Sequence, residues 1–94
     1  MAAGAAASNS GAPHLTLYSK PGCHLCDDMK AVIDRVARRL PLSLEVVDIS
    51  SDPDLLARYE LEIPVLLIEG RKVAKYRIGE RELEEKLRRL LLNQ

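Results

Sequence analysis

The stretch SKPGCHLCDDMK, residues 19–30, decides the fold of this chain because it places both cysteines, Cys23 and Cys26, between a predicted strand and a predicted helix. Residues 15–18, LTLY, have the length and composition of a strand, and Lys20-Pro-Gly22 is typical of a turn. A helix is therefore expected to begin near Cys23. Three interpretations of the cysteine pair are open at this point: a redox couple, half of a metal site, or two small buried side chains.

The helix predicted after this turn is amphipathic. Apolar residues recur at steps of three and four, with charged side chains largely outside the stripe, and Pro41 ends the pattern. The stripe consists of Leu25, Met29, Val32, Ile33, Val36 and Leu40. Residues 42–49, LSLEVVDI, alternate and then become largely apolar, which is typical of an inner strand. Together these segments predict a βαβ unit with two parallel strands.

A short helix and a strand led by proline are expected next. Asp52 suits an N-cap and Pro53 a first helical position, so the helix is predicted to run through Tyr59. Ile63-Pro64 then opens a strand. A cis bond there would bring the backbone of Ile63 beside the cysteine pair, with its N–H and C=O free for a peptide-like ligand, whereas a trans bond would mark only the strand entry.

The last part of the chain predicts a hairpin and a closing helix. Residues 65–68 and 72–77 are expected to pair around Glu69-Gly-Arg71. The closing helix carries leucines at helical spacing and oppositely charged pairs four residues apart, which are Glu82 with Lys86, Glu84 with Arg88, and Glu85 with Arg89. The order βαβ-α-ββα predicts an α/β, thioredoxin-like fold in which three helices flank a four-stranded mixed sheet.

Composition narrows the classes of function. The 94 residues suffice for one small domain, and Lys plus Arg and Asp plus Glu both total 14, so no net charge favours nucleic acid or an anionic membrane. The apolar runs are too short to span a bilayer. Residues 1–13 lack the features of a secretory signal and are expected to form a flexible tail before a domain at residues 14–94. Two closely spaced cysteines favour a reducing compartment such as the cytoplasm.

A C-x-x-C pair at a helix start suits thiol–disulfide exchange. Unpaired backbone N–H groups and the helix dipole favour a thiolate at Cys23, and Cys26, about one turn further in, is expected to be more buried and to act as the resolving thiol. Lys20 and a protonated His24 would lower the pKa of Cys23, whereas Asp27 would raise it. Asp27 also has a simpler role, because a carboxylate in a first helical turn stabilises the helix.

The metal interpretation is weaker. Zinc prefers four ligands, and the chain offers only two cysteines with His14 and His24, so no metal site is assigned within one chain. Two alternatives stay open: a dimer that carries an iron–sulfur cluster or zinc, and a binding module that keeps the fold without redox chemistry.

LTLYSKPGCHLC, residues 15–26, resembles the first strand and active-site loop of the glutaredoxin family, with a lysine three positions before the first cysteine. Ile63-Pro64 resembles the family's Val-Pro dipeptide. The chain is more similar still to a set of small glutaredoxin-like proteins with a C-x-L-C-D site and an IPV strand entry. This resemblance covers residues 15–92 and implies a cis Pro64, an Ile63 that pairs with the glutathione backbone, and ligand contacts from Lys20 and Glu80.

The chain departs from the glutaredoxin pattern in two places. The site is CHLC, and Arg77-Ile-Gly-Glu80 stands where glutaredoxins have Gly-Gly and an acidic residue. We therefore expect a thiol–disulfide oxidoreductase that acts on protein disulfides or glutathione mixed disulfides, with Cys23 as the nucleophile and Cys26 as the resolving thiol. Glutathione is a candidate co-substrate. No bound cofactor, nucleic acid or membrane partner is expected, and the chain is expected to be a monomer.

Overall fold

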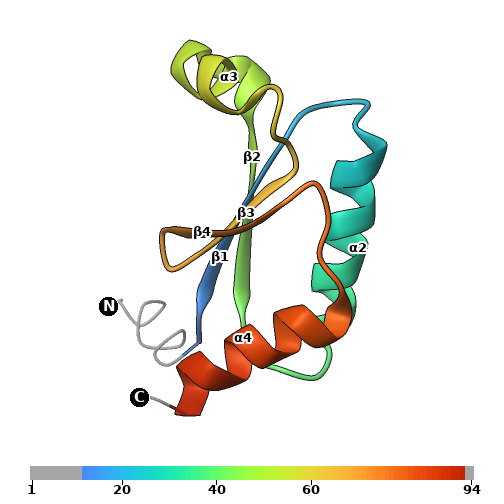
Figure 1. The fold of residues 1–94 in the computed structure, drawn as a ribbon, viewed down its shortest axis with the longest axis vertical. Helices are drawn as coiled ribbons and strands as arrows, with labels where there is room; N and C mark the ends of the chain where they lie inside the picture. The colour runs from blue at the N-terminus through green and yellow to red at the C-terminus, as the bar shows by residue number, and fades with distance from the viewer. Residues whose placement is uncertain (1–11, 93–94) are drawn as a thin grey trace, which may run out of the picture.

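The computed structural model describes residues 12–92, and within them it shows the predicted order of strands and helices (Figure 1). The elements are β1 (His14–Ser19), α2 (His24–Ala37), β2 (Ser43–Asp48), the 3₁₀ helix η1 (Ile49–Ser51), α3 (Pro53–Tyr59), β3 (Val65–Ile68), β4 (Arg71–Lys75) and α4 (Glu80–Leu92). The predicted fold class, a mixed four-stranded sheet with three α-helices, is therefore confirmed. Residues 1–11 of the expected tail lie outside the described residues, and Pro13 is buried.

The sheet has the strand order β2-β1-β3-β4. β1 pairs with β2 in parallel, whereas β3 runs antiparallel to both β1 and β4. The prediction of an inner strand for residues 42–49 is wrong, because β2 is an edge strand and Val46 is 46% exposed. The apolar end of that sequence reflects Ile49, which leaves the strand and is fully buried in η1.

One end of the sheet gathers segments from all four strands. Ser19 pairs with Asp48, Tyr18 with Val65, and Val65 with Lys75. Since β1 and β2 run in one direction and β3 in the other, the loop after β1, η1, the Ile63-Pro64 entry to β3 and the segment after β4 all meet at this end. The cysteine pair follows β1 and therefore lies among them.

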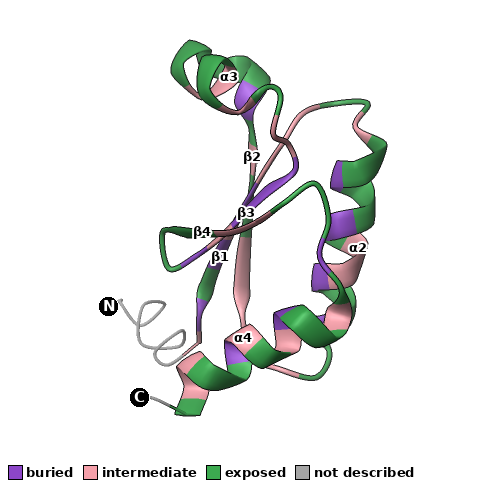
Figure 2. Ribbon diagram, viewed as in Figure 1, coloured by how far each residue is buried: buried purple, intermediate pink, exposed green. Residues whose placement is uncertain are grey.

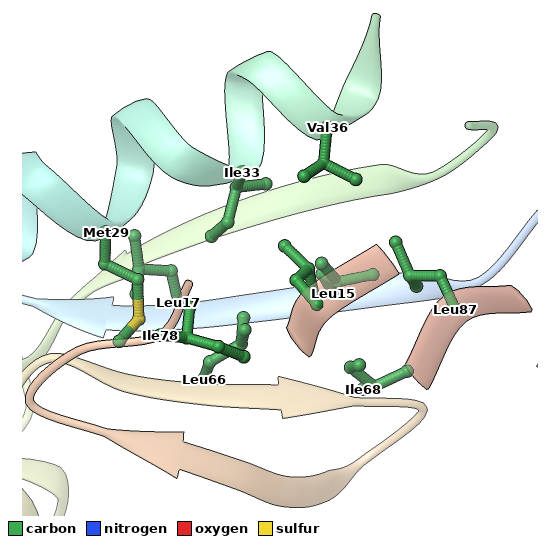
Figure 3. Close-up of a cluster of buried hydrophobic side chains, with 10 residues drawn as sticks. Leu15, Leu17, Met29, Ile33, Val36, Leu66, Ile68, Ile78 and Leu87 are labelled. Carbon is green, nitrogen blue, oxygen red and sulfur yellow. The ribbon is translucent and has the colours of Figure 1, made fainter. Parts of the chain in front are cut away.

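The core lies between one face of the sheet and the helices α2 and α4 (Figures 2 and 3). It consists of Leu15, Leu17, Leu66 and Ile68 from the sheet, Met29, Ile33 and Val36 from α2, and Ile78, Leu83 and Leu87 at the end of the chain. Most of the predicted α2 stripe thus faces the core. Leu25 is the exception at 36% exposed, because it lies one turn before Met29, the first residue of the stripe that is buried.

The opposite face of the sheet contacts α3. Tyr18 alternates with the buried Leu17 and stacks on Tyr59 at the end of α3, with ring centroids 4.7 Å apart. The predicted start of α3 is confirmed, since the Asp52 carboxylate accepts hydrogen bonds from the N–H groups of Asp54 and Leu55.

The β3–β4 turn is one residue shorter than predicted. Glu69 and Gly70 have φ values of 52° and 81°, and positive φ at both central positions suits a two-residue turn that matches the twist of the strands. β4 consequently begins at Arg71.

Helix α4 is amphipathic as predicted, with Leu83 and Leu87 buried. Of its three predicted charged pairs, Glu84 with Arg88 forms at 3.6 Å, and the ion pairs of residues 12–92 do not include the other two. Within the same residues, no helix is both long enough and apolar enough to cross a membrane.

Replacing the fully buried Leu87 with Ala should lower the free energy of unfolding by about 2–5 kcal/mol, because the change removes buried methyl groups and leaves a cavity. Chemical denaturation of the oxidised protein, followed by circular dichroism, measures this loss. Leu61, which is 85% exposed, provides the matched control, and Leu61→Ala should change the same quantity by less than about 0.5 kcal/mol. Equal effects of the two substitutions would contradict the packing of α4 on the sheet.

Candidate active site

The two cysteines form a disulfide at the N-terminus of α2, with their Cα atoms 5.2 Å apart. Cys23 is the N-cap residue, and its Sγ accepts a hydrogen bond of 3.1 Å from the backbone N–H of Cys26. Cys26 is 3% exposed, whereas Cys23 is only partly buried. The predicted positions, Cys23 at the helix start and a more buried Cys26 further in, are those found in the structure.

The loop before Cys23 turns the chain from β1 into α2. Gly22 has a φ of 81°, a conformation that glycine adopts without steric cost, and α2 begins two residues later. The first hydrogen bond of the helix runs from the Asp27 N–H to the Cys23 carbonyl at 3.1 Å. Cys23 is thereby held where the first N–H groups of the helix point outward.

Ile63-Pro64 lies at the same end of the sheet, and its peptide bond is cis. Pro64 is buried. The expectation that both backbone groups of Ile63 are free is wrong for its N–H, which donates to the Tyr59 carbonyl at 3.1 Å. The reason is that Tyr59 ends α3, so its carbonyl has no partner within the helix and accepts the bond from the following turn.

Tyr76 holds the segment around Pro64, a role that the sequence analysis missed. Its backbone N–H donates to the Pro64 carbonyl at 2.8 Å, and its hydroxyl donates to the Leu61 carbonyl at 2.9 Å. Tyr76 has a φ of 72°, which is uncommon for a residue other than glycine. Tyr76 falls within the strand predicted for residues 72–77, whereas β4 ends at Lys75, and a single aromatic residue in a predicted hairpin strand offers no signal from which this role could be inferred.

A polar hollow of about 240 Å³ lies beside the cysteine loop. Its lining brings together Lys20 and Asp27, both predicted site residues, with Ser19, Pro21, Gly22 and Asp48. The sequence analysis did not single out Asp48. The hydroxyl and the N–H of Ser50 both donate to the Asp48 carboxylate, and these bonds hold its pKa below the usual range, so the hollow contains a persistent negative charge.

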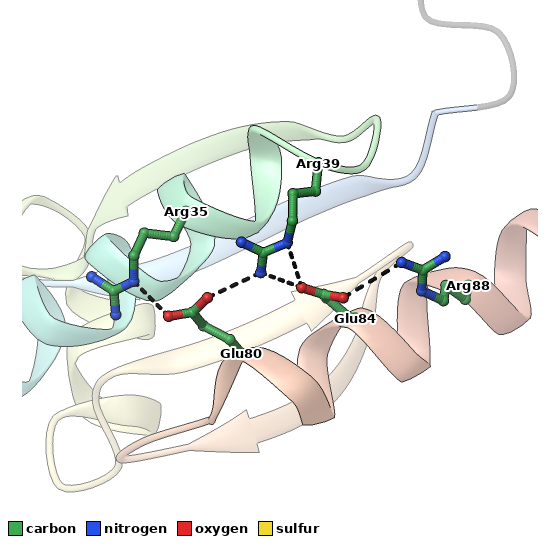
Figure 4. A network of polar contacts seen from close by, with 5 residues as sticks. All are labelled: Arg35, Arg39, Glu80, Glu84 and Arg88. Atoms are coloured by element: carbon green, nitrogen blue, oxygen red, sulfur yellow. Dashed lines mark hydrogen bonds and ion pairs between the residues drawn. The ribbon is translucent and has the colours of Figure 1, made fainter.

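Glu80, a predicted ligand contact, is bound to two arginines of α2 (Figure 4). Arg35 Nε donates to one carboxylate oxygen at 2.6 Å, and Arg39 Nη2 donates to the other at 3.0 Å. Arg39 also pairs with Glu84. The hydrogen bond from Arg35, followed by that from Arg39, lowers the pKa of Glu80, while Glu80 and then Glu84 raise the pKa of Arg39. In this structure Glu80 therefore links α4 to α2.

The two histidines occupy different places. His24 is an exposed first residue of α2, whereas His14 begins β1 at the end of the sheet away from the cysteines. The six residues of β1 span about 20 Å, which is too far for His14 to share a metal with Cys23. Residues 12–92 contain no group of three or more His, Cys, Asp or Glu side chains arranged to hold a metal ion.

This fold and this dithiol define a class, the thioredoxin-like proteins with a cysteine pair at the start of the first helix. Residues 14–88 match the model of the family described as "Glutaredoxin-like domain (DUF836)". The chain belongs to this family, and the resemblance inferred from its sequence is confirmed.

Solved structures agree with this assignment. Protein Ne2328 from Nitrosomonas europaea is 27% identical, with a TM-score of 0.71 over 81% of this chain and 92% of that chain. Target protein XcR50 from X. campestris is 32% identical, with a TM-score of 0.68 over 80% and 96% of the two chains. A mutant thioredoxin from Halobacterium salinarum is 16% identical with a TM-score of 0.65 over 89% and 79%, which shows the thioredoxin-like fold alone.

In the reduced protein, Cys23 should react with iodoacetamide before Cys26, because its side chain is accessible and that of Cys26 is not. Limiting reagent followed by peptide mass spectrometry measures the order of modification. In urea the two thiols should react at similar rates, which provides the control. Earlier modification of Cys26 in the folded protein would contradict the assignment of the accessible thiol.

The pKa of Glu80 predicts a pH-dependent contribution to stability. Because its folded-state pKa is depressed, this contribution is present above the unfolded pKa and is lost as the pH falls through the folded value. Glu80→Gln should therefore be less stable than wild type at pH 7, and the two should converge as the pH falls below the unfolded pKa and through the folded pKa of Glu80. Thermal unfolding across pH measures the difference. Glu85→Gln, at an exposed site on the same helix, is the control, and a difference for Glu80→Gln that does not vary with pH would contradict the network.

Proposed function

We propose that this chain is a thiol–disulfide oxidoreductase that exchanges its Cys23–Cys26 dithiol with disulfides of proteins or with glutathione mixed disulfides. The placement of Cys23 carries the proposal: it caps α2, accepts the Cys26 N–H at 3.1 Å and is accessible beside a buried second cysteine. A helix N-terminus stabilises a thiolate, which is the reactive form of cysteine. A redox-type function also agrees with the family and with the fold.

The exchange proceeds in two steps. The Cys23 thiolate attacks one sulfur of the substrate disulfide, so that a mixed disulfide forms while the other substrate sulfur leaves as a thiolate. The Cys26 thiolate then attacks Cys23 Sγ, which forms the internal disulfide and releases the second substrate sulfur. Two electrons pass from the dithiol to the substrate. A thiol reductant such as glutathione or a second dithiol returns the pair to its reduced form.

The residues around the pair divide into contacts for the substrate and charges near the thiols. Pro64 and the carbonyl of Ile63 are the proposed contacts for a peptide-like ligand, since the Ile63 N–H is already bonded to Tyr59. Lys20 supplies a cation for an anionic group, and His24 and Asp27 adjust the charge around Cys23.

Glutathione is a proposed co-substrate, and a contact from Glu80 would be shared with arginines. Both oxygens of the Glu80 carboxylate accept hydrogen bonds from arginines, so a donor on the ligand would share an oxygen with Arg35 or Arg39. We further propose that the protein acts as a monomer in a reducing compartment such as the cytoplasm, because the dithiol form must be maintained for the first step.

Equilibration in glutathione redox buffers, followed by alkylation and intact mass measurement, tests the proposal. Wild type should show a reversible Cys23–Cys26 disulfide. Cys23→Ser should abolish exchange, whereas Cys26→Ser should retain the first step and accumulate a mixed disulfide on Cys23. Circular dichroism of both variants controls for folding.

Two outcomes would overturn the enzyme assignment. Exchange that survives in Cys23→Ser would show that Cys23 is not the nucleophile. Thiols that stay reduced in every glutathione buffer would favour a binding module. Visible absorbance or stoichiometric metal in freshly purified protein would instead favour a dimeric iron–sulfur or zinc carrier.

A further inference from the structure

A second hollow, of about 220 Å³, lies between the β3–β4 hairpin and the C-terminal half of α4. Three apolar residues, Ile68, Val73 and Leu90, and three cationic residues, Arg71, Lys86 and Arg89, line it. Ile68 points towards α4 beside Leu87 (Figure 3). Because Ile68 pairs with Arg71 at the hairpin turn and Val65 pairs with Lys75 at the other end, this hollow lies at the opposite end of β3 from the cysteine loop.

The cations of this hollow differ from five other cations of the chain, which form ion pairs. Lys30, Arg35, Arg39, Lys72 and Arg88 each pair with a carboxylate. The ion pairs formed within residues 12–92 include none of the three lining cations. Glu82 and Glu85, four residues before Lys86 and Arg89, are exposed and do not pair with them. The hollow thus has a positive charge that the described carboxylates do not neutralise by direct contact.

A helix-dipole effect explains only part of this arrangement. Cations in the last turn of a helix are stabilising, and this accounts for Arg89 on α4. Lys86 precedes that turn, and Arg71 belongs to β4. Bringing a third like charge to the same hollow raises the repulsion between the three cations, and a bound anion would relieve it.

We propose that this hollow binds a small organic anion whose carboxylate meets Arg71, Lys86 and Arg89 while a short apolar group covers Ile68, Val73 and Leu90. The volume sets the size of the ligand. At roughly 30 Å³ for each water, 220 Å³ corresponds to about seven waters, which is below the range of about 300–1,000 Å³ typical of sites for drug-sized molecules. A carboxylate of the size of hexanoate fits this volume. The site is separate from the cysteines and does not depend on the proposed redox function.

Titration of ¹⁵N-labelled protein with sodium hexanoate, followed by two-dimensional NMR, tests the proposal. Saturable shifts should appear at the amides of Ile68, Val73 and Leu90. Hexylammonium has the same apolar group with the opposite charge, and acetate has the same charge without that group, so both should bind at least about five-fold more weakly. Equal binding of hexylammonium, or hexanoate shifts that are confined to the cysteine end, would overturn the proposal.

Variants separate the cations of the hollow from general surface charge. Arg71→Gln combined with Arg89→Gln should weaken hexanoate binding by about five- to ten-fold, because each exposed charge pair contributes modestly to affinity. Arg81→Gln, on the exposed first turn of α4 and outside the hollow, is the matched control and should bind as wild type does. The single variant Arg71→Gln repeats the test with less risk to folding. Wild-type affinity in both hollow variants would refute the site.

Discussion

The packing of α2 against the sheet is the interaction on which the rest of the structure depends. Met29, Ile33 and Val36 are buried against Leu15, Leu17 and Leu66, which fixes both the height and the rotation of the helix over β1. The same packing holds the start of α2, with its N-cap Cys23, at the loop end of the sheet. The position of the first helical turn over the sheet therefore depends on apolar burial several residues further along.

The candidate site is assembled from segments that are far apart in the sequence. The antiparallel β1–β3 pairing brings Ile63-Pro64 to the end of the sheet that carries the cysteine loop, and β3–β4 pairing brings Tyr76 to the same end. Tyr76 then bonds to the backbone on both sides of Ile63, through the carbonyls of Leu61 and Pro64. Tyr76 forms none of the described hydrogen bonds with either cysteine, but it holds the backbone that is proposed to contact the substrate.

Local patterns predicted the fold well, because each signal acts over a few residues. The turn before Cys23, the stripe of α2, and the Asp52-Pro53 start of α3 all depend on neighbours in the chain. The features that the sequence did not predict depend on contacts between elements, such as the order of the strands in the sheet. The edge position of β2 follows from β3 pairing with β1, and no pattern within residues 42–49 encodes that choice. The bond between Ile63 N–H and Tyr59 likewise depends on how α3 ends, which its apolar pattern does not specify.

Ion pairs also show that sequence patterns predict contacts within an element better than contacts between elements. The spacing of four residues correctly predicts the Glu84–Arg88 pair, but Glu80 and Glu84 also receive arginines from α2, and these interhelical bonds have no sequence spacing to reveal them. Two carboxylates of the acidic first half of α4, Glu80 and Glu84, are consequently paired with α2, whereas Lys86 and Arg89 in the second half lack ion-pair partners in the described chain. The formal charge of the whole chain is zero, but the two ends of α4 differ in the sign of their charge. The negative end serves the fold, and the positive end stays available to an external anion.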